Sequence, residues 1–200
     1  DDKKGCSDDD SLDSAGRSVR HPNRYCQILN YQIPNYSDLR AIYLWPPLTE
    51  FIRQVLNVEH LFLSQCPHLA LTMKVAYEGD TDGWHYDPND GVITLVLQTA
   101  DNGGEFEYAP NIRNKNDQNY AGVDRLFKSP DVEATRPTLE PGTFTFFNGR
   151  HSMHRVRPVG STRQPRIVSI FFFDQRPDHF FAQSYIDKLR RFPQGPPIVD

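Results

Sequence analysis

The pattern of apolar and polar positions predicts one amphipathic helix followed by a long run of strands. In residues 49–59, just after Pro46-Pro47, apolar residues recur at helical spacing, namely Phe51, Ile52, Val55 and Leu56. From Leu69 onward the period changes to two, which predicts a strand with one face formed by Leu71, Met73, Val75 and Tyr77. A helix is therefore expected to precede a sheet.

Short apolar runs bounded by turn residues predict four further strands, at 92–99, 105–109, 143–147 and 166–173. Residues 111–139 form a long polar insertion between two of them, and such connections are usually lids or binding loops. A C-terminal helix is expected at about 179–191. This order favours an α+β fold with flanking helices and a double-stranded β-helix (jelly roll, cupin-like) core over about 69–174.

Composition narrows the class of protein. Residues 1–20 hold too little apolar surface to repay ordering, so we expect a flexible acidic tail or loop, followed by a single domain at 21–200. The net charge of -4 argues against nucleic-acid and anionic-membrane partners. No apolar run approaches the roughly 18 residues that cross a bilayer. Three widely spaced cysteines fit a reducing cytoplasm.

His85 and Asp87 form the first half of a candidate metal site. Because they are two residues apart, an extended segment points both side chains to the same side. The turn signal at residues 88–91 places the pair at a strand end, where loops and function often meet. A His-x-Asp pair occurs by chance in many proteins, so a second half is needed.

That second half lies near the last predicted strand. His154 begins an extended piece, and Arg166 follows twelve positions later at the start of an apolar strand. Two histidines and one carboxylate form the facial triad of non-haem Fe(II) sites, which leaves three coordination positions open. An arginine among apolar residues needs an anionic partner, which the far carboxylate of a 2-oxo acid would supply. The alternative for Arg166 is an exposed cation at the strand end.

At these residues the chain resembles the 2-oxoglutarate- and Fe(II)-dependent oxygenases. Their pattern of His-x-Asp, a distant His and an Arg about a dozen residues later matches His85, Asp87, His154 and Arg166. Four ordered blocks, at 83–90, 103–108, 141–143 and 154–159, look like the branch that contains free-amino-acid hydroxylases and radical halogenases. The resemblance covers roughly residues 40–180.

The resemblance implies an enzyme that uses Fe(II), 2-oxoglutarate and O2, with His85, Asp87 and His154 as catalytic metal ligands and Arg166 binding 2-oxoglutarate. Hydrogen is removed from an unactivated C–H bond and hydroxyl takes its place, while succinate and CO2 are released. In halogenating members a small residue replaces the carboxylate ligand so that halide can bind iron. This chain keeps Asp87, so we expect a hydroxylase.

Neighbouring residues compete for two of these roles. His151 is an odd number of positions from His154, so only one of them can point at a shared metal from an extended chain, and the resemblance favours His154. Arg163, in a polar turn, is an alternative to Arg166. Tyr77 is a further candidate for binding the co-substrate carboxylate, with an ordinary core tyrosine as the alternative.

The primary substrate is expected to be a small polar molecule, a free amino acid or a derivative. The residues next to the metal motif that could bind it are Trp84, Asn89, Asp90, Glu105 and Glu107. Acidic groups there would suit an ammonium group, whereas a solvated strand face is the alternative. A homodimer is left open.

Three other functions fit parts of the pattern. A protein- or peptide-modifying oxygenase would use the same metal motif on a larger substrate. A non-catalytic jelly-roll binding protein would use the residues for a structural ion or for none. A zinc hydrolase would need a positioned general base and has no use for Arg166.

Overall fold

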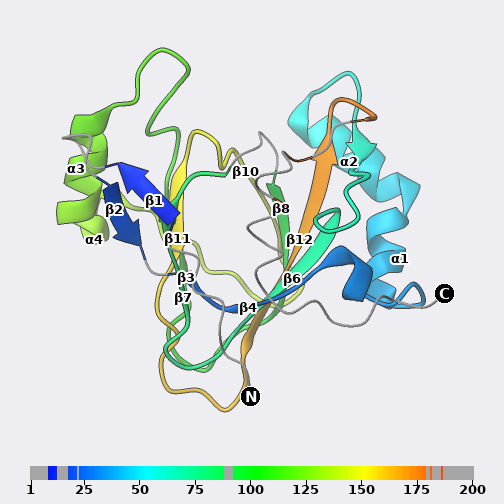
Figure 1. Cartoon of the computed structure of the whole chain (residues 1–200), viewed down its shortest axis with the longest axis horizontal. Helices are drawn as coiled ribbons and strands as arrows, with labels where there is room; N and C mark the ends of the chain where they lie inside the picture. Colours follow the sequence, from blue (N-terminus) through cyan, green and yellow to red (C-terminus); the bar gives the residue numbers. More distant parts are fainter. Residues whose placement is uncertain are drawn as a thin grey trace. The chain divides into compact units, whose positions relative to one another are not determined.

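The part of the chain that the computed structural model describes consists of residues 9–12, 18–21, 23–87, 92–178, 181 and 186. It divides into two compact units, drawn together in Figure 1. Unit 1 comprises Asp1–Cys26 and Val75–Val168, and unit 2 comprises Gln27–Lys74 and Ser169–Asp200. In this part of the chain, no helix has both the length and the apolar character needed to cross a membrane.

Unit 1 contains an antiparallel sheet in the strand order β3-β7-β11-β9. These strands are β3 (Asn23–Arg24), β7 (Thr81–His85), β9 (Phe106–Ala109) and β11 (Met153–Val156). The pairing of β11 with β9 is regular along its whole length. The pairing of β11 with β7 is not, because His154 lies opposite His85 whereas Val156 lies opposite Asp82. One extra residue in β7 therefore forms a β-bulge beside the predicted ligands.

Two more strand pairs belong to unit 1. Strand β8 (Val92–Gln98) pairs antiparallel with β10 (Phe144–Phe147). Both confirm the short apolar strands predicted at 92–99 and 143–147. Strand β1 (Asp9–Leu12) pairs antiparallel with β2 (Ser18–His21). A flexible acidic tail or loop was expected at 1–20, whereas residues 9–12 and 18–21 pair as strands, because backbone pairing does not depend on apolar side chains.

The polar insertion at 111–139 holds two helices that its few apolar residues did not predict. They are α3 (Tyr120–Lys128) and α4 (Pro130–Glu133). Helix α3 begins after Asn119, whose side-chain oxygen accepts a hydrogen bond from the Gly122 N–H at 3.2 Å. Such a cap satisfies a backbone donor that the first helical turn leaves without a partner.

Helix α3 packs on one face of the four-stranded sheet. Its residues Val123 and Leu126, one turn apart, are buried in a core cluster with Trp84, Ala109 and Met153. Figure 1 shows α3 and α4 on one side of β11. The insertion, which the sequence suggested as a substrate lid, thus covers this face of the sheet with α3.

Unit 2 holds the helix predicted at 49–59. Helix α2 (Pro46–Leu56) confirms it but starts three residues earlier, because proline is well suited to the first turn of a helix. It ends where Asn57 takes a left-handed φ of 52°. Helix α1 (Asp38–Leu44) precedes it and is capped by the Ser37 side chain, which accepts from the Arg40 N–H.

The remaining elements complete the order of the chain. They are β4 (Cys26–Ile28), the 3-10 helix η1 (Asn30–Gln32), β5 (Phe62–Leu63), β6 (Leu71–Ala76) and β12 (Arg166–Asp174). In unit 2, the end of β12 pairs antiparallel with β5. The mixed fold with antiparallel sheets agrees with the predicted α+β class, while the jelly-roll arrangement and the single domain at 21–200 stay predictions. Most of the helix expected at 179–191 lies outside the described residues.

Candidate metal site

Strands β7 and β11 bring the two predicted histidine ligands together within unit 1. His85 is the last residue of β7 and lies directly opposite His154 of β11. Opposite residues of an antiparallel pair project to the same face, and the two imidazole rings have centroids 4.2 Å apart. We call this side of the sheet the metal face, and the side that carries Trp84 and α3 the reverse face.

Asp87 completes the group from the residues just after β7. Its backbone N–H donates to the carbonyl oxygen of Gly149 at 3.1 Å, which holds the segment against the loop before β11. The carboxylate oxygens lie 3.9 Å from Nε2 of His85 and 3.6 Å from Nε2 of His154. The three potential ligand atoms all lie within 4.8 Å of one another, so they can share one ion.

Backbone carbonyls orient both imidazoles. Nδ1 of His85 lies 2.7 Å from the Gly83 carbonyl oxygen, and Nδ1 of His154 lies 2.9 Å from that of Ser152. With Nδ1–H as the donor in each case, the Nε2 lone pairs face Asp87, which is the usual tautomer of a metal ligand. Burial alone would lower the pKa of His154, but the Asp87 carboxylate, with smaller contributions from the Ser152 carbonyl and Asp82, outweighs burial and raises that pKa.

Gly149 leaves the space that the Asp87 carboxylate fills. A Cβ atom at residue 149 would lie only 1.8 Å from Oδ2 of Asp87. No side chain fits there unless the carboxylate moves. The glycine is therefore part of the construction of the site, although the sequence pattern gave no reason to single it out.

Arg166, the predicted co-substrate ligand, also belongs to unit 1. Burial lowers the pKa of its guanidinium to about 10, with the Asp82 carboxylate acting in the opposite direction. Within the described residues, the guanidinium of Arg166 has neither a hydrogen bond nor an ion pair. Gly104 has a left-handed φ of 71°, and a Cβ there would lie 3.0 Å from Cδ of Arg166. The glycine thus lets the arginine stem lie close to the backbone.

Asp82 is a second carboxylate near the histidines that sequence reasoning missed. It is 6% exposed, and its Oδ1 lies 3.8 Å from Nδ1 of His85. Strict alternation would point residues 82 and 85 to opposite faces. The bulge in β7 cancels that alternation and aligns Asp82 with Val156 instead.

Aromatic rings enclose His154 on the metal face. The ring of Phe147 meets the imidazole edge to face at 4.8 Å between centroids, and Phe106 lies at 5.8 Å. Tyr108 stacks on Phe106 at 5.8 Å. These rings shield the histidine from water and restrict its rotation.

His151 and Arg163, the alternatives to His154 and Arg166, contact other residues. Nδ1 of His151 lies 3.2 Å from the side-chain oxygen of Asn148, and His151 is not one of the three clustered ligands. Arg163 makes a two-pronged ion pair with Asp101, at 3.0 and 3.1 Å, and these hydrogen bonds lower the pKa of Asp101 to about 2. Of the two histidines, His154 and not His151 therefore belongs to the ligand cluster.

Two of the predicted substrate residues, Trp84 and Glu107, lie on the reverse face. Trp84 is 4% exposed and packs under α3, while Glu107 is wholly buried among arginines on the same reverse face. Glu105 is exposed and lies 3.8 Å from Nε of Arg157. Tyr77 is 47% exposed.

Two other substrate candidates, Asn89 and Asp90, lie outside the described residues.

Comparisons with known proteins agree with this geometry. Among solved structures the chain is similar to an oxidoreductase of the 2OG-Fe(II) oxygenase family from Burkholderia pseudomallei, with a TM-score of 0.53, 14% identity, and coverage of 83% of this chain and 71% of that one. It is also similar to AviO1 from Streptomyces viridochromogenes, with a TM-score of 0.56, 11% identity, and coverage of 91% and 77%. At such identities the likeness concerns the fold. No curated protein matches the sequence.

A family model supplies the decisive match. The model described as halogenase D matches residues 3–182, nearly the whole chain. Together with the fold and the His-Asp-His group, this match confirms the expected class of enzyme, a non-haem iron oxygenase that uses Fe(II), 2-oxoglutarate and O2. The chain belongs to the halogenase D family, within the 2-oxoglutarate- and Fe(II)-dependent oxygenases.

Proposed function

We propose that this protein hydroxylates an unactivated C–H bond of a small polar substrate, a free amino acid or a derivative, with Fe(II) bound by His85, Asp87 and His154. The observation that carries the proposal is the cluster of their ligand atoms within 4.8 Å on strand ends of one sheet. Two imidazoles and one carboxylate are a donor set that suits Fe(II) and leaves three positions for co-substrate and O2. When bound, the iron and 2-oxoglutarate supply the oxidising power, and 2-oxoglutarate leaves as succinate and CO2.

Hydroxylation is proposed rather than halogenation because of Asp87. The family is described as a halogenase family, and its halogenating members are expected to have a small residue where this chain has a carboxylate. Here Asp87 fills the space beside both histidines, and Gly149 opposite is adapted to that carboxylate. A halide would have to displace it.

Arg166 is proposed to bind the far carboxylate of 2-oxoglutarate. A guanidinium that is desolvated and has no ion pair among the described residues is stabilised by an anionic ligand. Its planar group donates two parallel hydrogen bonds to a carboxylate. Tyr77 and the residues Asn89 and Asp90 stay candidates for further contacts, and the jelly-roll core remains part of the proposal.

The surrounding side chains have separate tasks. Phe106 and Phe147 exclude water from His154 and hold its ring. The Gly83 and Ser152 carbonyls keep a proton on each Nδ1, so that Nε2 remains available to the metal.

The test is anaerobic visible spectroscopy of the metal-free protein, titrated first with Fe(II) and then with 2-oxoglutarate. A weak charge-transfer band that needs both additions is expected in the wild type and in a His151→Ala control, and is expected to be absent in His154→Ala. Amino acids would then be screened by mass spectrometry for a gain of one oxygen atom, with and without chloride. A folded protein that binds Fe(II) but never shows the band would overturn the proposal, and a chlorinated product would overturn hydroxylation.

A further inference from the structure

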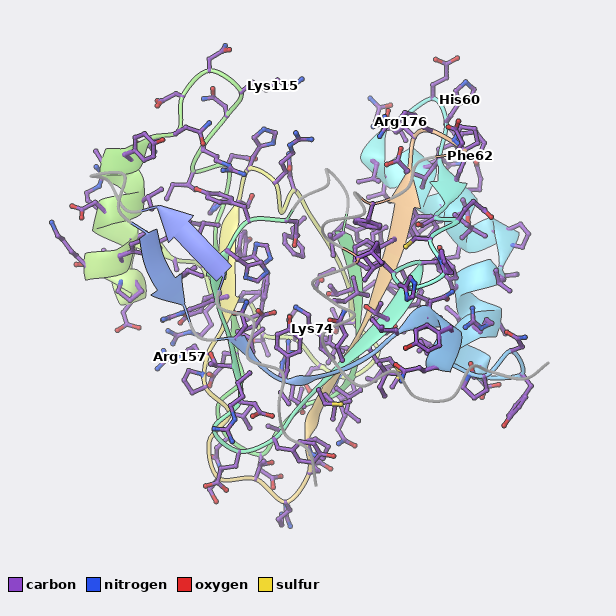
Figure 2. All side chains as sticks on the ribbon, in the orientation of Figure 1. His60, Phe62, Lys74, Lys115, Arg157 and Arg176 are labelled. Carbon is purple, nitrogen blue, oxygen red and sulfur yellow. The ribbon has the colours of Figure 1, made fainter. Side chains whose placement is uncertain are left out.

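A cluster of charged side chains lies on the reverse face, directly behind the metal site. At its centre is Glu107 of β9, whose side chain is wholly buried. One carboxylate oxygen accepts from Nε of Arg155 at 2.6 Å, and the other accepts from Nε of Arg136 at 2.8 Å and from a terminal nitrogen of Arg157 at 3.3 Å. In Figure 2, Arg157 projects from unit 1 on the side of α3 and α4.

The arginines more than compensate for the burial of Glu107. Burial would raise the pKa of this carboxyl group, but the hydrogen bonds from Arg155 and Arg136 lower it below its ordinary value. Glu107 is thus a buried anion held by charge-assisted hydrogen bonds, which are short and strongly directional. Arg136 also pairs with Asp131 at 3.0 Å, so the cluster fastens the insertion to the sheet.

The cluster reaches the neighbours of both histidine ligands. Arg155 follows His154 in the chain, and Trp84 precedes His85. The Arg155 guanidinium carbon lies 4.6 Å from the centroid of the Trp84 ring, a cation–π contact. One line of contacts therefore runs across the reverse face from Glu107 on β9 through β11 to β7.

This line crosses the sheet where the backbone pairing of β7 with β11 is interrupted. The bulge interrupts the β7–β11 pairing between His154 and Val156, at the level of Arg155. On the other side of β11 the ladder with β9 is regular, and Arg155 lies directly opposite Glu107. Since a bulge loosens the local register, side-chain contacts have to fix the separation of β7 and β11 at that point.

We propose that Glu107 is a positioning residue of the metal site, which acts through Arg155 and Trp84 to hold His154 and His85 at the separation that lets both Nε2 atoms share one ion. It touches neither metal nor substrate. The proposal rests on the metal site proposed above. It assigns to Glu107 and Trp84, both first considered for substrate binding, a role from the opposite face of the sheet.

The test compares Glu107→Gln with Glu105→Gln, two residues away, whose exposed carboxylate pairs with Arg157 but has no ion pair with Arg155. The metal-free variants are titrated with Co(II), and the visible spectrum of the bound ion and its dissociation constant are recorded. We expect Glu107→Gln to bind Co(II) about 10- to 100-fold more weakly, as is typical for groups that orient metal ligands, and to show altered absorption bands. Glu105→Gln should match the wild type in both.

Three further variants, at two positions, keep the test decisive if Glu107→Gln does not fold. Arg155→Lys keeps the charge but loses the planar fork, so we expect weaker Co(II) binding, whereas Trp84→Phe keeps a ring under Arg155 and should bind more tightly than Trp84→Leu. Folding is checked by circular dichroism. A wild type that fails to bind Co(II) would overturn the proposed metal site together with this inference. Wild-type binding with folded variants of unchanged affinity and spectrum would overturn the inference alone, even if the variants melt at lower temperature.

Discussion

The contact between Gly149 and Asp87 gives the sharpest prediction for the metal site. In Gly149→Ala, the new Cβ would lie 1.8 Å from Oδ2 and 2.6 Å from Cγ of Asp87. Non-bonded heavy atoms settle at roughly 3.5 Å, so the carboxylate has to move by about 1.5 Å. Functional sites tolerate displacements of only about 0.5 Å. The carboxylate would therefore leave its place between the two histidines.

We expect Gly149→Ala to bind divalent metal at least about 100-fold more weakly, which corresponds to about 2.7 kcal/mol. The backbone at residue 149 is not left-handed, so alanine can adopt it, and the fold should persist. Calorimetric titration of the metal-free protein with Mn(II), a redox-stable substitute for Fe(II), measures the change. Circular dichroism measures the fold.

The matched control is Gly160→Ala. The three atoms nearest to its new Cβ all belong to Asn102, with the closest at 3.2 Å, and its backbone is not left-handed either. This variant should bind Mn(II) like the wild type. If folded Gly149→Ala also bound Mn(II) with wild-type affinity, Asp87 would not be a ligand in the arrangement described, and the reasoning would fail.

Three further predictions follow from charge and burial. Arg166→Met should weaken 2-oxoglutarate binding by about 10- to 100-fold through loss of charge-assisted hydrogen bonds, whereas Arg163→Met should not; calorimetry with the Mn(II)-loaded protein distinguishes them. Leu126 is wholly buried, so Leu126→Ala should lower the free energy of unfolding by about 2–5 kcal/mol. Val132 is 83% exposed, so the control Val132→Ala should lower it by less than about 0.5 kcal/mol. Urea unfolding measures both changes. Because the native pKa of Glu107 lies below its ordinary value of 4.5, its carboxylate stabilises the fold above that pH, and this contribution disappears as the pH falls through the native pKa. Urea unfolding should thus show a difference between wild type and Glu107→Gln at pH 7 that shrinks at pH 3, and an equal difference at both would contradict the ion-pair account.

Local sequence patterns predicted the elements and residues whose positions depend only on their neighbours in the chain. Helical spacing predicted α2 at 49–59, and the helix begins and ends three residues earlier, at Pro46 and Leu56. The two-residue spacing of His85 and Asp87 placed both on one side of the chain because an extended backbone alternates its side chains. His154 lies 69 positions beyond His85, so its role came from the resemblance of the block around it and not from spacing.

Several features depended on contacts that no local pattern contains. Helix α3 escaped prediction because its apolar residues are few and gain their stability from packing on Trp84 and Met153. Gly149 is distant in sequence from the carboxylate for which it leaves room. The sequence suggested that Glu107 binds substrate, but the register of β9 and β11 places it opposite Arg155.

The pairing of His85 with Asp87 was therefore readable from short spacing in the chain itself, whereas His154 and the class of chemistry were readable from the resemblance of the sequence blocks. The face of the sheet on which each residue next to the metal motif lies was determined only by the tertiary structure. The bulge in β7 turns Asp82 toward the histidines, against the alternation that its sequence position implies. A single extra residue in one strand reverses every side chain beyond it, and strand pairing, not local sequence, determines where that residue is accommodated.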